Sequence, residues 1–173
     1  MKGLLKAEML LPLAIVVAAI TLGASELMKA FEFTPPGGDP LSDQLAGDRH
    51  GWAMLVLAIF ALLSLAMSIS TGQRARAWAT AGCGIVALLL FLVVDLPDVN
   101  KIGDVEVPGG LGLASAKAIP QPGFWLEAAA AIVLALAGIA YATQVADKRR
   151  APRRLWPPRS RAPRRPAPKQ ASR

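Results

Sequence analysis

Uncharged, strongly apolar stretches recur four times along this chain, at residues 9–25, 51–73, 77–94 and 128–146, and most charged side chains lie between or after them. A helix needs about 20 mostly apolar residues to cross a hydrocarbon core of about 30 Å. In lipid, only a helix lets an isolated stretch satisfy all its backbone N–H and C=O groups with hydrogen bonds inside the segment. The pattern therefore predicts an all-α membrane protein, a four-transmembrane-helix bundle with spans at about 9–28, 51–72, 77–95 and 124–146.

Small residues also recur at three- and four-residue spacing in each stretch. In the third stretch they are Ala79, Cys83 and Ala87, with Gly82 and Gly84 beside them. Helices in lipid associate through close packing of such residues. We therefore expect the four helices to pack against one another along these faces.

Composition supports a membrane protein. Of the 173 residues, 54% are hydrophobic and 18% charged, whereas soluble domains average about 45–50% and about 25%. A single cysteine excludes a disulfide framework within the chain, and a single histidine excludes a multi-histidine metal cluster. These counts leave no constellation typical of catalysis, so we expect neither an enzyme nor a bound cofactor.

The charges between the stretches predict the orientation. Residues 1–8, 74–76 and the tail from residue 147 carry 15 of the 19 Lys and Arg, whereas the connections 26–50 and 95–127 are acidic. The positive-inside rule then places both termini in the cytoplasm of a multi-pass plasma (inner) membrane protein. As an alternative, the first stretch is a cleavable signal ending near Gly23-Ala24-Ser25, which leaves three spans.

The two connections predicted to lie outside, 29–50 and 96–123, each contain a short alternation of apolar and polar residues. These are Phe31-Glu32-Phe33 and Asp104-Val105-Glu106-Val107, each followed by a Pro-Gly turn. We expect the two pieces to pair as a small extracytoplasmic β element.

Polar residues gather at the predicted outer ends of the spans. They are Asp48, Arg49, His50, Asp95, Asp98 and Glu127. We expect them to anchor helix ends and to form salt bridges in which Asp95 and Glu127 face Arg49 or His50. The alternative is a cation or ligand site made by His50, Asp95, Asp98 and Glu127, but the sequence spacing is not that of a metal motif, so no metal ligand is assigned. Because no ionisable residue lies in the middle of a span, a pump or proton-coupled carrier is not favoured.

The segment 148–173 is rich in arginine and proline and contains 11 of the 19 basic residues. It has too little apolar surface to fold alone, so we expect a disordered cytoplasmic tail. Its first basic residues would contact anionic lipid headgroups; they are Lys148, Arg149, Arg150, Arg153 and Arg154. An acidic protein partner is the second interpretation, and nucleic acid is the least favoured.

Three short phrases resemble uncharacterised small four-span membrane proteins of high-GC, actinobacterial-type bacteria. They are Gly47-Asp48-Arg49-His50-Gly51-Trp52, Asp95-Leu96-Pro97-Asp98 and Gly123-Phe124-Trp125-Leu126-Glu127. The resemblance implies a bacterial plasma membrane and no known activity. The layout is also similar to that of claudins, although the first outer connection lacks their cysteine pair.

Together these features favour a structural or accessory membrane protein. We expect it to engage partners through its outer connections and lipid through its tail, either with another membrane protein or as a homo-oligomer. The alternative is a subunit of an oligomeric channel or transporter.

Overall fold

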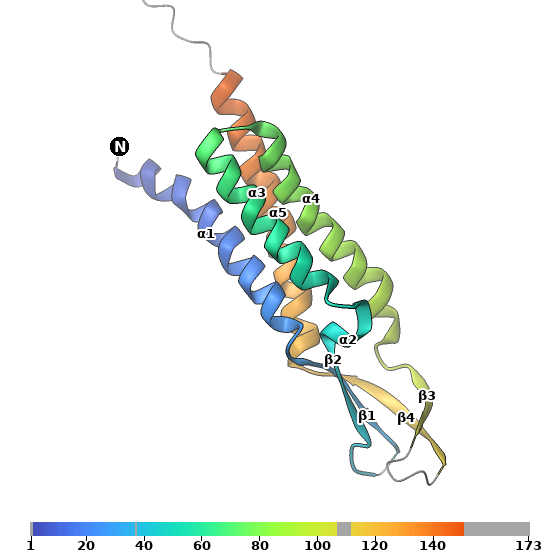
Figure 1. The fold of residues 1–173 in the computed structure, drawn as a ribbon. Helices are drawn as coiled ribbons and strands as arrows, with labels where there is room; N and C mark the ends of the chain where they lie inside the picture. Colours follow the sequence, from blue (N-terminus) through green and yellow to red (C-terminus); the bar gives the residue numbers. More distant parts are fainter. Residues whose placement is uncertain (1, 37, 107–111, 151–173) are drawn as a thin grey trace, which may run out of the picture.

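Four long helices form an elongated bundle with a small β-sheet at one end (Figure 1). This computed structural model describes residues 2–36, 38–106 and 112–150. The elements are α1 (Lys2–Ser25), β1 (Lys29–Thr34), β2 (Ser42–Leu45), α2 (Ala46–His50), α3 (Ala53–Thr71), α4 (Arg74–Leu90), β3 (Ile102–Glu106), β4 (Leu113–Pro120) and α5 (Pro122–Arg150). A π-helical turn, Phe91–Asp95, and a 3₁₀ turn, Leu96–Asp98, extend α4.

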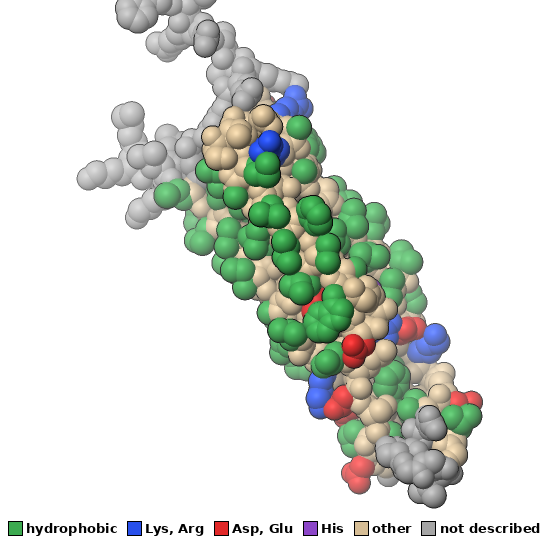
Figure 2. All heavy atoms as spheres, viewed as in Figure 1, with side chains coloured by type: hydrophobic (Ala, Val, Ile, Leu, Met, Phe, Trp, Pro, Cys, Tyr) green, Lys and Arg blue, Asp and Glu red, His purple; other side chains and the backbone are tan. Residues whose placement is uncertain are grey.

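Three helical segments of the described chain are long and apolar enough to cross a membrane: Ala53–Thr71, Arg74–Asp98 and Pro122–Asp147. The apolar part of α1, Met9–Ser25, is shorter. Figure 2 shows hydrophobic side chains covering the helical part on the face in view, with charged side chains gathered at its two ends. This distribution is compatible with a multi-pass membrane protein.

Helix α5 packs along both α4 and α1, and α3 packs along the other side of the same two helices. The contact between α4 and α5 is the closest. A methyl group added at Gly84 would lie 2.5 Å from the Ala135 nitrogen, and one at Gly138 would lie 2.8 Å from Ala81 Cα. Each glycine thus lets the backbone of the other helix approach directly.

The buried face of α4 differs from the face expected from sequence. The buried residues are Ala77, Thr80, Ala81, Gly84 and Ala87, whereas Ala79 is exposed and Cys83 is half-buried. Both faces contain small residues at helical spacing, so the spacing alone did not decide which one meets α5.

The predicted small β element is confirmed as a four-stranded antiparallel sheet with strand order β2-β1-β4-β3. The two predicted pieces do not pair directly, however, because β4 lies between them. Phe33 pairs with Ala118, and Val105 pairs with Ala114. In β4, Ala116 and Ala118 are buried while Ser115 and Lys117 are exposed, so small alanines occupy the inward positions of the middle of the sheet.

Helix α5 continues to Arg150. The side chains of Lys148, Arg149 and Arg150 are not among those that the structure describes, and Arg153 and Arg154 lie outside the described residues. The predicted contacts of the tail with lipid therefore concern a part of the chain beyond this structure.

Candidate functional site

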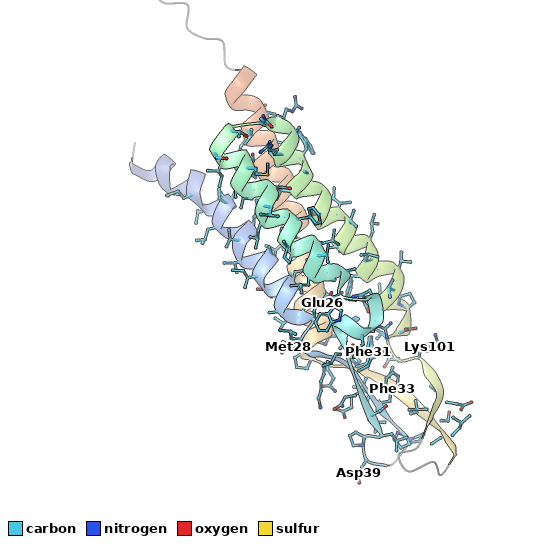
Figure 3. The ribbon with its side chains drawn as sticks, in the orientation of Figure 1. Glu26, Met28, Phe31, Phe33, Asp39 and Lys101 are labelled. Carbon is cyan, nitrogen blue, oxygen red and sulfur yellow. The ribbon has the colours of Figure 1, made fainter. Side chains whose placement is uncertain are left out.

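Six ionisable residues meet where the bundle joins the sheet. This junction cluster consists of Glu26, Arg49, His50, Asp95, Asp98 and Glu127. Glu26 follows the last residue of α1, and Figure 3 shows it at the end of the bundle where the sheet containing Phe31 begins. Arg49 and His50 end α2, while Asp95 and Glu127 come from the ends of α4 and α5 that face the sheet. Residues distant in sequence are thus placed together by the ends of four helices.

Arg49 connects the end of α4 to the sheet. Its Nε donates to Asp95 Oδ1 at 2.8 Å, and its Nη2 donates to Asp98 Oδ2 at 2.5 Å and to the Val94 carbonyl at 3.0 Å. The guanidinium lies 4.7 Å from the centre of the Phe31 ring and also reaches Gln44 of β2. A planar group with several fixed donors suits this position, since it satisfies two carboxylates and stacks on an aromatic ring at once.

His50 lies between three carboxylates. Its Nδ1 is 3.4 Å from Glu26 Oε1, and its Nε2 is 3.3 Å from Asp95 Oδ2 and 3.4 Å from Glu127 Oε1. The Asp95 carboxylate, followed by that of Glu127, raises the pKa of His50 from 6.5 to about 10, although burial acts in the opposite direction. When no other cation is present, His50 therefore carries a proton on each nitrogen at neutral pH.

The backbone around the cluster is shaped to hold these side chains. Glu26 Oε1 accepts a hydrogen bond of 2.8 Å from the Met54 amide in the first turn of α3, a favourable position for a carboxylate. Gly47 leaves room for Glu26, because a Cβ there would lie 2.9 Å from Glu26 Oε2. Two consecutive residues with left-handed backbone, Gly51 and Trp52, then turn the chain from α2 into α3.

The π-helical turn at the end of α4 positions Asp95. Its first and last residues, Phe91 and Asp95, are both buried. π-Turns are often found at functional sites. Phe91 and Phe31 each pack against Phe124, with ring centres 4.9 and 5.4 Å apart. These three rings close off the cluster on its apolar side.

Several polar atoms of the cluster are buried and have no hydrogen-bond partner among the described residues. They are Glu26 Oε2, both ring nitrogens of His50, Asp95 Oδ2 and Glu127 Oε1. The side chains of Asp95 and Glu127 are each only 1% exposed. The contacts of the His50 nitrogens with these carboxylates, at 3.3–3.4 Å, are long for hydrogen bonds. Buried polar groups are almost always satisfied, so such weakly paired atoms indicate a place for a proton, a water molecule or a cation.

A hollow of about 740 Å³ lies beside the cluster, between the sheet and α2. Four of its lining residues are acidic, Asp43, Asp48, Asp98 and Asp104, and two are basic, Arg49 and Lys101. Phe33 and Val105 supply apolar surface. Arg49 and Asp98 belong to both the lining and the cluster, so the hollow leads to the buried charges.

Of the six residues singled out from sequence, the structure brings five together: Arg49, His50, Asp95, Asp98 and Glu127. Asp48 is exposed and lines the hollow instead. Sequence reasoning missed Glu26, which is fully buried. The available signal for its burial was that apolar residues, Leu27 and Met28, follow this acid and continue the apolar pattern of the first stretch.

Three residues of the cluster are of the types that bind metal ions. One donor atom each from His50, Asp95 and Glu127 lies within 4.8 Å of the other two. These three residues could hold a metal ion, with Glu26 and Arg49 holding the ligands in place.

Comparison with known protein families, curated proteins and solved structures finds no match for this chain. Its function therefore has to be argued from its own residues.

Proposed function

We propose that this chain is a four-pass membrane protein of structural or accessory type, which presents its sheet outside the membrane as a contact surface for a partner protein. The observation that carries the proposal is the hollow beside the sheet. Arg49 of the junction cluster holds this sheet to the end of the bundle through Gln44 of β2 and Asp95. A surface fixed in this way meets a partner already ordered, so less entropy is lost on binding.

The packing of α1 supports a fourth span. The helix lies along α5 and α3, and its outward positions carry large exposed apolar side chains: Met9, Leu10, Leu13, Val17 and Ile20. In water such a stripe would be an aggregation hazard. The apolar part of α1, Met9–Ser25, has 17 residues and covers about 25 Å at about 1.5 Å per residue. A few more residues at either end can extend this length across the membrane.

The charge distribution supports the orientation. The turn between α3 and α4, at the end away from the sheet, is followed by Arg74 and Arg76, and the basic tail follows α5 at that same end. Positive residues favour the cytoplasmic side. The sheet and its hollow would then face outward, and the tail would adhere to anionic headgroups inside.

The lining of the hollow suggests the chemistry of the partner. It combines apolar patches at Phe33 and Val105 with more acidic than basic side chains. A protein segment with basic residues flanking an apolar side chain complements this surface. Among the four acidic lining residues, Asp98 and Asp43 have ion-pair partners in the described structure, so Asp48 and Asp104 are the acids offered to a partner.

Topology is tested by thiol labelling in intact cells. In a Cys83→Ser background, a cysteine at Asp39 should react with an impermeant maleimide, whereas one at Gln73 should react only after the cells are permeabilised. The opposite pattern would overturn the orientation. Labelling at both positions in intact cells would overturn the four-pass topology.

The contact surface is tested with a photo-crosslinking amino acid at Val105, which lines the hollow, and a matched control at Ile119 on the other face of β4. We expect a discrete adduct with a second membrane protein from Val105 only, and its loss when Asp48→Lys is added. An adduct of two copies of this chain would instead favour the oligomeric alternative, and equal adducts from both positions would overturn the assigned surface.

A further inference from the structure

We propose that His50, Asp95 and Glu127 bind a divalent first-row transition-metal ion, for which Zn²⁺ is the test ion. The inference stands apart from the proposed partner surface, because it rests on the interior of the junction cluster. One imidazole nitrogen with two carboxylate oxygens is a donor set that suits zinc, manganese or iron(II).

The spacing of the donor atoms fits one ion. His50 Nε2 is 3.3 Å from Asp95 Oδ2 and 3.4 Å from Glu127 Oε1, and the three atoms lie within 4.8 Å of one another. Ligands bound tetrahedrally at about 2.0–2.2 Å are themselves about 3.4 Å apart.

Asp95 and His50 are each held by a neighbour through an atom other than the proposed donor. Asp95 Oδ1 accepts from Arg49 Nε at 2.8 Å, so Oδ2 remains for the ion. Asp95 Oδ2 and Glu127 Oε1 are buried and without hydrogen-bond partners among the described residues. A ligand that is fixed by a neighbour is pre-organised for metal.

Glu26 supplies the outer partner of the histidine. Its Oε1 lies 3.4 Å from His50 Nδ1 and is itself held by the Met54 amide at 2.8 Å. A histidine ligand commonly donates its second ring N–H to a carboxylate, and this contact fixes which nitrogen faces the metal. The proton on Nδ1 therefore leaves Nε2, the nitrogen that faces Asp95 and Glu127, for the ion.

The charges of the junction favour a divalent ion over a proton alone. Four carboxylates, those of Glu26, Asp95, Asp98 and Glu127, meet Arg49 and the Lys101 amine that pairs with Asp98. Carboxylates outnumber bases here, so a divalent ion placed among them would offset part of their negative charge. Uncompensated charge is unfavourable in a buried site. The acids of the neighbouring hollow attract cations to its entrance.

The experiment uses the full-length protein without a histidine tag, purified in detergent and stripped with a chelator. We expect Zn²⁺ to bind with one ion per chain by calorimetry and to raise the unfolding midpoint. Glu127→Gln should weaken this binding more than about 100-fold, because loss of an outer partner alone costs about 10–100-fold. The matched control Glu32→Gln makes the same change on β1, outside the cluster, so its affinity should stay within about threefold.

A spectroscopic readout separates ligation from folding. Co²⁺ added to the stripped protein should give visible absorption bands that Zn²⁺ displaces, and X-ray absorption of the Zn²⁺ form should show nitrogen and oxygen ligands with a single imidazole. Saturable binding that Glu32→Gln weakens as much as Glu127→Gln would overturn the assigned ligands. The absence of stoichiometric binding to the folded wild-type protein would overturn the site itself.

Discussion

The α4–α5 contact and the junction cluster hold this molecule together by opposite means. Along α4 and α5 the backbones approach directly, with Gly84 against Ala135 and Gly138 against Ala81. At the junction, Arg49, His50 and four carboxylates add ion pairs to the packing of Phe31, Phe91 and Phe124 between the helix ends and the sheet. The two regions are parts of the same helices.

The difference follows from the surroundings of each region. In lipid, burying apolar surface gives little driving force, so close packing of small residues has to hold the helices together. At the sheet end, the helices stop, and their polar backbone ends and loops have to be connected to the sheet. Hydrogen-bonded charged side chains make directional contacts there. The stability of the α4–α5 contact is therefore sensitive to added side-chain volume, and that of the junction cluster to the loss of a charged partner.

The largest effect is expected from removing the one guanidinium of the junction. Arg49→Met leaves Asp95, which is 1% exposed, without its partner. Removing one member of a buried ion pair destabilises by about 3–5 kcal/mol, and we expect this loss in the free energy of unfolding measured in detergent. The control is Arg74→Met at the opposite, exposed end of α4, which should change it by less than about 1 kcal/mol. Equal losses of unfolding free energy in the two variants would show that the ion pairs of the junction contribute no more to stability than an exposed surface charge.

The helix contact is expected to respond to a single methyl group. Gly84→Ala places Cβ 2.5 Å from the backbone of α5, so the helices must separate, and overpacking of this kind destabilises by about 1–3 kcal/mol. Gly82→Ala is the matched control, because a Cβ there meets no atom within 4 Å. Its unfolding midpoint should not fall. A decrease of equal size in both variants would mean that the effect comes from the helix itself rather than from α5.

The periodicity of the chain predicted much of the fold. The helical stretches and the short alternation at Phe31–Phe33 lie in helices and in β1. The strands β2 and β4 were missed, since Ser-Asp-Gln-Leu is short and polar and the alanines of β4 have little strand preference. Alternation of alanine with Ser115 and Lys117 was the available signal. Which strands become neighbours depends on where the helix ends meet, and periodicity does not contain that information.

The candidate site was predictable only in outline. The positions of Arg49, His50, Asp95 and Glu127 at the ends of apolar stretches placed them at one end of a bundle. Their contacts depend on the rotation of each helix, on the π-helical turn that directs Asp95 inward and on the left-handed turn at Gly51 and Trp52. These features arise from tertiary packing. Glu26 was hidden because one acid at the end of an apolar helix more often faces the interface than the interior.

The third prediction concerns the supporting role of Glu26. Its removal should weaken Zn²⁺ binding less than the removal of a metal ligand does. Glu26→Gln keeps an oxygen for the Met54 amide but removes the negative charge beside His50 Nδ1. Loss of such an outer partner weakens metal binding by about 10–100-fold. Zn²⁺ titration of the chelator-treated variant measures this, with Glu32→Gln on β1 as a control that should keep the wild-type affinity. An unchanged affinity in Glu26→Gln would remove Glu26 from the site.

The smallest effect is expected from an ion pair outside both regions. Lys29 and Asp43 pair between β1 and β2, and their side chains are 53% and 41% exposed. The pairing raises the pKa of Lys29, but solvent screens an exposed pair and leaves it little influence on stability. We therefore expect Lys29→Gln to leave the unfolding midpoint unchanged within error, and added salt to have no effect on the difference between the two proteins. A decrease approaching that of Arg49→Met would contradict the comparison, because it would mean that exposure does not decide which charges hold the sheet to the bundle.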